Sequence, residues 1–219
     1  MSKIFKHPFL YSLICLIGLS ATTQAQFKVT QWKERDSWQN VPEILIALNI
    51  QRGSKVADIG CHEGYLSMHL AKMVGKQGKV YSVDIEQYKL NKLNKEAKKR
   101  GFKQVQTILG AYDDPKLPKG SLDAIVVMRT YHEISSYMKY LKHLKEALKP
   151  GGRLVILESI RKSRVKWTRS SQTSYHELSI PIVKAEMKKV GFSNIMTWSK
   201  VAYWKKNKKR PLWMMRGMK

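Results

Sequence analysis

The chain has 219 residues, 43% of them hydrophobic, which is enough to bury one sizeable core and argues against several domains. Its 41 Lys and Arg outnumber its 16 Asp and Glu and give a formal net charge of +25, which favours anionic partners over cationic ones. Nucleic acid, acidic lipid headgroups and phosphorylated substrates all meet that description.

The first 25 residues have the pattern of a secretory signal peptide. Lys3 and Lys6 precede an apolar run over residues 8–21, and small residues lead to a cleavage site expected after Ala25. The run of 14 residues is short for a bilayer span, which needs about 20. We therefore expect an exported, periplasmic protein, with an uncleaved membrane anchor as the alternative. Cleavage leaves Cys61 as the one cysteine, so no intramolecular disulfide is expected.

Residues 26–50 form the expected lead-in to the domain. The stretch 26–40 is polar apart from Trp32 and Trp38, and Pro42 sits where a helix through Asn49 would begin. The two tryptophans could cover a bound molecule, but aromatic packing over the core is favoured. The main domain is expected over residues 51–219.

A strand, a tight turn and a helix are predicted around residues 55–65. An apolar strand ends at Asp58-Ile59-Gly60, and a second glycine, Gly64, precedes a helical pattern. Glycine is needed where φ is positive or where a ligand approaches the backbone closely. The helix N-terminus offers unpaired N–H groups, and Asp58 can anchor a ribose or an amino group. A nucleoside cofactor fits this arrangement, although a purely structural turn can also carry two glycines.

The second predicted strand, 79–84, strengthens the cofactor interpretation. Its last residue, Asp84, lies 20 positions beyond Gly64, where a doubly wound fold binds ribose hydroxyls. The nicotinamide fingerprint Gly-x-Gly-x-x-Gly is not matched, because His62 occupies its middle glycine position.

Alternating helices and strands continue to the end of the chain. A helix over 86–100 carries a lysine stripe interpreted as a solvated face, and Arg129-Thr130-Tyr131-His132-Glu133 follows the fourth strand. Residues 161–174 are basic and serine-rich and predict a mobile flap. The further elements are a strand 105–109, a loop 110–118, a strand 124–128, a helix 135–149, a strand 153–158, a helix 179–190, and a closing hairpin around 205–210.

The turn Asp58-Ile59-Gly60-Cys61-His62-Glu63-Gly64 resembles motif I of the class I S-adenosylmethionine-dependent methyltransferases, Asp/Glu-x-Gly-x-Gly-x-Gly, with His62 in the central glycine position. The resemblance continues through Val83-Asp84-Ile85, residues 110–118 and 122–125, and Lys149-Pro150-Gly151-Gly152, and it covers roughly residues 38 to 200. The chain looks like a subgroup of that family with export signals. The resemblance implies an α/β Rossmann-like fold with a mostly parallel seven-stranded sheet, helices on both faces and a C-terminal antiparallel hairpin.

S-adenosylmethionine is the cofactor that the resemblance implies. Gly60, His62 and Gly64 would line its methionine part, Asp58 would hold the turn or the amino group, and Asp84 would bind the ribose. Ala111 stands where similar enzymes often have the acid that contacts adenine, so that role passes to Asp113 or Asp114 or is absent.

The segment after the fourth strand is the candidate catalytic region. Ligands of open parallel sheets lie beyond the carboxyl ends of strands, and histidine is suited to act as a base near neutral pH. His132 is the candidate base, Tyr131 would shape the pocket and His176 would reach it from the flap. Capping or packing of His132 is the alternative. No metal is expected, because the side chains of adjacent His-Glu pairs should diverge.

The predicted function is methyl transfer to a small or lipid-like acceptor. An RNA methyltransferase is the first alternative, favoured by the charge, and a non-catalytic binding protein is the second. Residues 159–219 hold 16 Lys and Arg against Glu177 and Glu186, so this basic C-terminal region is a candidate contact with an anionic membrane surface.

Overall fold

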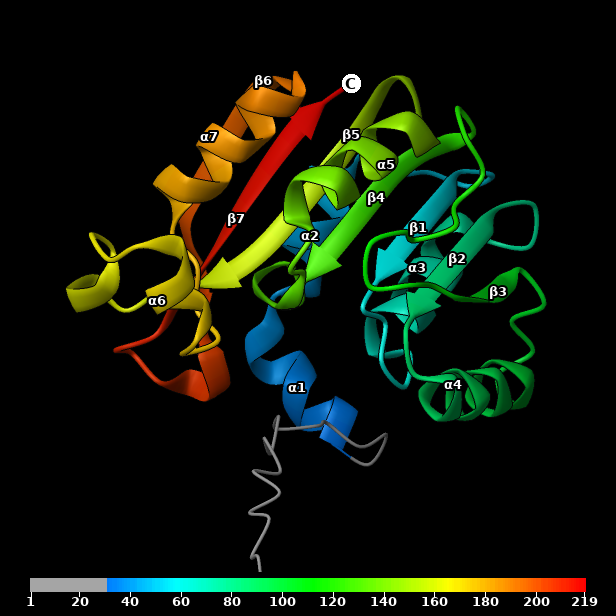
Figure 1. Ribbon diagram of the computed structural model, residues 1–219. Coiled ribbons are helices and arrows are strands. Elements are labelled where there is room, and N and C mark those ends of the chain that lie inside the picture. Colours follow the sequence, from blue (N-terminus) through cyan, green and yellow to red (C-terminus); the bar gives the residue numbers. More distant parts are fainter. Residues whose placement is uncertain (1–30) are drawn as a thin grey trace, which may run out of the picture.

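One seven-stranded sheet organises the computed structural model, which describes residues 31–219 (Figure 1). The predicted signal peptide and the first part of the lead-in lie outside these residues. The strand order is β3-β2-β1-β4-β5-β7-β6; the first five strands are parallel, and β7 runs antiparallel to both its neighbours. The strands are β1 (Lys55–Ile59), β2 (Lys79–Asp84), β3 (Val105–Leu109), β4 (Leu122–Met128), β5 (Leu148–Ser159), β6 (Ser193–Tyr203) and β7 (Pro211–Met218).

The central strands are buried on both faces, which is why they read as continuous apolar runs. β4, for example, has all but one of its seven residues buried. β1 lies between β2 and β4, and the chain order of the strands reverses at this point. Because parallel strands end at one edge, the residues after β1, β2 and β4 meet there, at the position where such sheets bind ligands.

Helices cover both faces of the sheet. One apolar core packs α2, α3 and α4 against the sheet through residues such as Ile44, Leu70 and Leu93, and the other packs α5 and α7 through Leu141 and Val183. Each of these side chains is completely buried, which contributes about 1.5–3 kcal/mol apiece. The helices are α1 (Trp32–Gln39), α2 (Val41–Leu48), α3 (Tyr65–Val74), α4 (Gln87–Lys99), α5 (Tyr137–Ala147), α6 (Arg169–Thr173) and α7 (Ile180–Val190), with the 3₁₀ turns η2 (Tyr131–Glu133), η3 (Lys162–Arg164) and η4 (Trp204–Lys206). Within residues 31–219, none of them is both long and apolar enough to cross a bilayer.

The polar segment before α2 is itself a helix, α1, which lies beyond the carboxyl ends of the central strands (Figure 1). Two buried tryptophans hold it there. The Trp32 ring packs edge-on against Tyr65 with centroids 5.9 Å apart, and the Trp38 ring packs in the same way on Trp204 at 5.3 Å. These contacts agree with the packing role favoured for the two tryptophans, and they place α1 over the site.

Candidate active site

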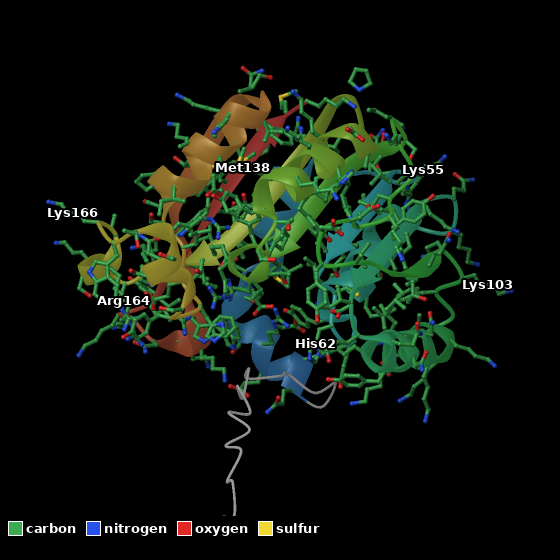
Figure 2. All side chains as sticks on the ribbon, viewed as in Figure 1. Lys55, His62, Lys103, Met138, Arg164 and Lys166 are labelled. Atoms are coloured by element: carbon green, nitrogen blue, oxygen red, sulfur yellow. The ribbon has the colours of Figure 1, made fainter. Side chains whose placement is uncertain are left out.

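A cavity of about 470 Å³ opens at the carboxyl edge of the sheet. Figure 2 shows the two ends of β1: Lys55 lies at its start, away from the cavity, and His62 follows its end and lines the cavity. Residues after β1, β2 and β4 line the cavity, together with residues from α1, from η4 and from the segment before α7. A volume of this size suits a cofactor-sized ligand.

The turn after β1 requires both of its glycines. Gly60 has φ +68°, and a Cβ there would lie 2.1 Å from Thr130 Oγ1. Gly64 has φ +94°, and a Cβ there would meet the Leu93 side chain at 2.7 Å. His62 also has a positive φ, 51°, a conformation in which histidine is found more often than most residues. His62 therefore adopts the backbone conformation that a glycine would have at this position of the turn, and it adds an imidazole side chain.

Asp84 fixes this turn from the neighbouring strand. Its Oδ2 accepts a hydrogen bond from the His62 N–H at 2.9 Å, and its Oδ1 accepts one from the Glu86 N–H at 3.1 Å. Its carboxylate is almost buried and lines the cavity. The His62 Nε2 atom is buried and has no hydrogen-bond partner among the described residues. Burial, and then the positive charge of Lys89, lowers the pKa of His62.

Asp58 is a buried carboxyl at the end of β1. Its Oδ2 accepts a hydrogen bond from Ser67 Oγ at 2.7 Å, and Ser67 in turn accepts one from Ser82 Oγ at 2.8 Å. Burial raises its pKa from 3.8 to about 6, although the Ser67 hydrogen bond and Arg35 act in the opposite direction. Asp58 and Asp84 thus place two acidic groups on adjacent strands at one end of the cavity.

His132 lies at the other end of the cavity, against a buried carboxylate from β5. Its Nδ1 is 2.9 Å from both oxygens of Glu158, which also accepts hydrogen bonds from the His132 N–H at 3.1 Å and from Arg129 Nη1 at 2.8 Å. Burial alone would lower the pKa of His132, but the charge of Glu158 and the hydrogen bonds to Glu133 and Glu158 together outweigh it, and the pKa is raised. Burial alone would raise the pKa of Glu158, but the charges of His132 and Arg129 and the hydrogen bonds from His132 together outweigh it, and the pKa is lowered.

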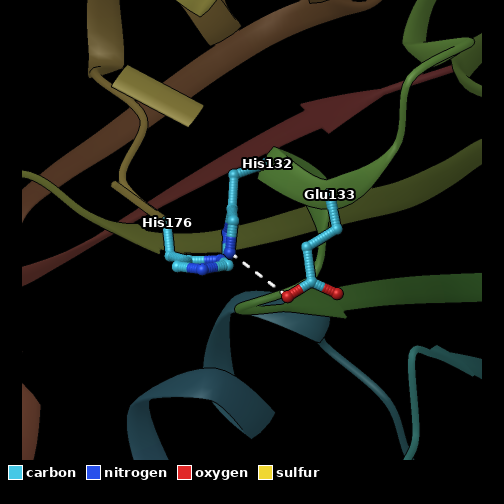
Figure 3. Close-up of side chains that lie close together, drawn as sticks. All are labelled: His132, Glu133 and His176. Atoms are coloured by element: carbon cyan, nitrogen blue, oxygen red, sulfur yellow. Dashed lines mark ion pairs between the residues drawn. The ribbon is translucent and has the colours of Figure 1, made fainter. Parts of the chain in front are cut away.

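Glu133 and His176 complete a cluster with His132 (Figure 3). Glu133 Oε1 is 3.4 Å from His132 Nε2, and the two imidazole rings meet edge to face with centroids 5.5 Å apart. Burial, and then the charge of His132, lowers the pKa of His176. Adjacent side chains were expected to diverge, but η2 turns those of His132 and Glu133 toward each other.

Three predicted site residues, Tyr131, Asp113 and Gly64, do not line the cavity. Tyr131 is completely buried on the opposite side of η2, where its hydroxyl donates a hydrogen bond to Glu186 Oε2 at 2.7 Å. Asp113 is exposed and accepts a hydrogen bond from Lys139 Nζ at 2.6 Å. Gly64 is the N-cap residue of α3. The other predicted residues do line the cavity: Asp58, Gly60, His62, Asp84, His132 and His176.

The segment predicted as a flap also departs from expectation. Residues 161–174 contribute no side chain to the cavity and are folded into η3 and α6. Gln172 is buried beneath them, and its Nε2 donates to the carbonyls of Arg164, Val165 and Trp167, each at 3.0 Å. A buried glutamine that hydrogen-bonds to three carbonyls stabilises one conformation of this segment. His176, which follows the segment, does line the cavity.

Sequence reasoning missed several residues of the cavity wall. Lys89 was assigned to a solvated stripe, yet it is buried and pairs with Glu86. Trp204, which is not among the predicted site residues, lines the cavity with the Arg129 guanidinium 4.7 Å from its ring centre. Arg35 enters from α1 and lies over the Tyr65 ring at 4.1 Å. The sequence held a signal for Lys89, because it lies only five residues after Asp84, a predicted site residue. The positions of Arg35 and Trp204 in the cavity wall depend on packing between segments remote in sequence.

Comparisons with known proteins agree with this geometry. A family model described as a methyltransferase domain matches residues 50–215. A demethylmenaquinone methyltransferase of Anoxybacillus flavithermus is 28% identical over 131 residues, which cover 60% of this chain and 54% of that protein. The chain thus matches little more than half the length of that relative.

Two solved structures share the fold. A SAM-dependent methyltransferase from Aquifex aeolicus has a TM-score of 0.67 at 24% identity, over 88% of this chain and 98% of that one. Phosphoethanolamine N-methyltransferase 2 of Haemonchus contortus, solved in complex with S-adenosyl-L-methionine, has a TM-score of 0.66 at 16% identity, over 83% and 52%. These likenesses and the strand order confirm the predicted Rossmann-like class I methyltransferase fold with its closing antiparallel hairpin.

Proposed function

The chain belongs to the methyltransferase domain family, and we propose that it transfers a methyl group from S-adenosylmethionine to a lipid-like acceptor of the quinol class. The family confirms the predicted enzyme class and its cofactor. One observation carries the proposal: a single cavity joins the acidic end at Asp58 and Asp84 to the His132 end beyond β4. The cofactor and an acceptor can therefore meet in one cavity.

The residues of the acidic end fit the cofactor. S-adenosylmethionine carries a positive sulfonium and an amino group, and when bound it supplies an electrophilic methyl group. Asp58 and Asp84 offer carboxylates to the amino group and the ribose, and His62 Nε2 is a buried nitrogen without a protein partner among the described residues. Gly60 lets the turn pack directly against Thr130, which also lines the cavity. Exposed Asp113 is unsuited to the adenine contact; Ile85 and Tyr112, which line the cavity, offer apolar surface instead.

The acceptor end combines apolar and charged surface. Met128, Ile134 and Trp204 line it, and Arg129 stacks on the Trp204 ring. A flat aromatic acceptor with hydroxyl groups matches this lining, and the curated relative named for demethylmenaquinone supports a quinol. The chemistry is an in-line displacement. The acceptor's nucleophilic atom bonds to the methyl carbon as the carbon–sulfur bond breaks and the acceptor loses a proton. The protein's main task is to align the two molecules.

Export and membrane contact are further parts of the proposal. The composition of residues 1–25 supports export as in the subgroup with signal peptides, and the lysines around residues 205–210 support contact with anionic lipid, the phase in which a lipid-like acceptor dissolves. Cell fractionation with N-terminal sequencing tests export. Cosedimentation with vesicles that contain or lack anionic lipid tests the surface contact.

Two measurements test the function. Calorimetric titration with S-adenosylmethionine should give one site, and Asp84→Ala should weaken it at least tenfold, the loss typical of one charge-assisted hydrogen bond. Purified protein should then transfer labelled methyl from the cofactor to a demethylmenaquinol analogue. Transfer to RNA instead would favour the nucleic-acid alternative. Absence of cofactor binding by the unmodified chain would favour a non-catalytic binding protein and contradict the proposal.

A further inference from the structure

The geometry points to a divalent transition-metal site formed by His132, Glu133 and His176 on the acceptor side of the cavity. Each residue contributes one ligand atom, and the three atoms lie within 4.8 Å of one another (Figure 3). Two come from η2 after β4 and the third from the segment that precedes α7. Two imidazoles and a carboxylate are a donor set that suits Zn²⁺ and its first-row neighbours, whereas Mg²⁺ and Ca²⁺ prefer oxygen ligands.

His132 is oriented as a metal-binding histidine is. Glu158 is a completely buried carboxylate whose two oxygens lie 2.9 Å from Nδ1. A carboxylate only accepts, so Nδ1 carries the proton in the neutral ring and Nε2 presents its lone pair on the far side, toward Glu133. Metal-bound histidines are held in this way, by a carboxylate on the nitrogen that does not bind the ion. Glu158 is not one of the three proposed ligands, so its contact with Nδ1 is an observation separate from the closeness of the three ligand atoms.

A cation can lie between His132 and Glu133. In the neutral ring, Nε2 is an acceptor, and it faces the acceptor Oε1 of Glu133 at 3.4 Å. That distance is too long for a good hydrogen bond. A proton would serve two atoms, but His176 brings a third ligand atom to the same place. A metal ion satisfies all three.

The distances suit such an ion after a small adjustment. Ligand atoms about 2.1 Å from a tetrahedral ion are about 3.4 Å from one another. The Nε2 to Oε1 distance already has this value. The remaining atoms approach through Glu133 and His176, which are partly or largely exposed, while buried His132 stays in place. Of the two nearby guanidinium groups, Arg129 is paired with Glu158 at 2.8 Å, whereas Arg210 lies 3.5 Å from Glu177, a carboxylate that it shares with two other arginines.

The consequence for catalysis rests on the proposed function. Three protein ligands leave a position open toward the cavity, as in catalytic metal sites. An acceptor hydroxyl bound there has a lowered pKa and releases its proton to water. The oxygen, or a ring carbon conjugated with it, then forms the bond to the methyl carbon as the carbon–sulfur bond breaks. His132 acts as a ligand in this scheme and not as the base predicted from the sequence, because one Nε2 cannot serve both roles.

Metal binding is measured without methyl donor or acceptor. The full chain, purified with a tag that lacks histidine and treated with a chelator, is titrated with Zn²⁺ by calorimetry and with Co²⁺ by visible absorption. We expect one ion per chain and the intense bands of a tetrahedral Co²⁺ site. His176→Ala and Glu133→Gln should each weaken binding at least tenfold, and Glu158→Gln about 10–100-fold. His143→Ala should leave affinity unchanged, because His143 is a half-buried residue of α5 that does not line the cavity.

The outcomes separate the metal site from the proposed function. No bound ion, or affinity unchanged by His176→Ala in a variant with an unaltered circular dichroism spectrum, would overturn the metal site. Methyl transfer that survives complete chelation at an unchanged rate would overturn its role while leaving the function intact. A metal site that forms in a protein unable to bind S-adenosylmethionine would retain the site and remove the function. His132→Ala is a second variant that removes a proposed ligand. His176→Ala is the variant less expected to disturb folding, because the His176 side chain is not in the core.

Discussion

The raised pKa of Asp58 predicts that replacing this residue stabilises the protein and weakens the site. Its carboxyl is buried at the end of β1, and burial raises its pKa from 3.8 to about 6. An acid with a raised folded-state pKa stabilises the fold fully below the unfolded-state pKa and loses that contribution as the pH rises through the folded-state pKa. A shift of about two units corresponds to about 3 kcal/mol.

Asp58→Asn should remove this pH-dependent loss of folding stability, because the amide stays neutral and its oxygen can still accept the hydrogen bond from Ser67 Oγ. The difference in unfolding free energy between variant and wild type should therefore rise by about 2 kcal/mol between about pH 4.5 and pH 7, the part of the titration within that range. Urea denaturation at both pH values measures this difference, and contributions from other groups cancel. The variant should also bind S-adenosylmethionine more weakly at neutral pH.

A constant free-energy difference at both pH values would refute the assignment of an ionising buried Asp58. Ser67→Ala is the matched control, because it removes the hydrogen bond and keeps the carboxyl. The loss should raise the Asp58 pKa further and steepen the fall of stability with pH. If Asp58→Asn gains stability and keeps full cofactor affinity, the carboxylate has no part in cofactor binding.

Three other substitutions test the geometry around the cavity. Gly60→Ala should cost about 2–4 kcal/mol in urea denaturation, since the new Cβ overlaps the threonine after β4, whereas Gly53→Ala, which also has a positive φ but open space, should cost about 1 kcal/mol. Tyr131→Phe should cost about 1–2 kcal/mol by removing the hydrogen bond to Glu186 and leave the methyl-transfer rate within about twofold. Asp113→Asn should leave cofactor affinity, measured by calorimetry, within about twofold, because its carboxylate is exposed and pairs with a surface lysine.

The sheet could be predicted because its signals are local. β2 and β3 have the bounds expected from apolar runs beside glycine, and the hairpin of β6 and β7 forms around residues 205–210 as expected. α1 could not be predicted as a helix, because its two tryptophans are held by Tyr65 and Trp204, which are remote in sequence. A polar segment that folds through distant contacts carries no periodicity to detect.

The site was predictable only to the level of segments. His132 and Tyr131 are neighbours, yet η2 turns one side chain to the cavity and the other into the core, and that depends on a turn geometry that spacing does not report. Glu158 had a usable signal that was missed. β4 and β5 are parallel with Met128 opposite Leu157, so the next residues, Arg129 and Glu158, were bound to lie side by side at the ligand edge.

The net positive charge of the chain favours anionic partners, yet the proposed cofactor is a cation. The two agree because most of the basic residues lie outside the cavity. Asp58, Asp84, Glu86 and Glu133 are matched among the cavity residues by four basic side chains, Arg35, Lys89, Arg129 and Arg210, although the whole chain has 41 basic and 16 acidic residues. Charges on the outer surface are screened over about 8–10 Å at physiological salt, whereas two carboxylates within contact of a buried ligand are screened much less. The excess charge therefore acts on partners outside the protein, and the acids at the ends of β1 and β2 decide what binds inside it.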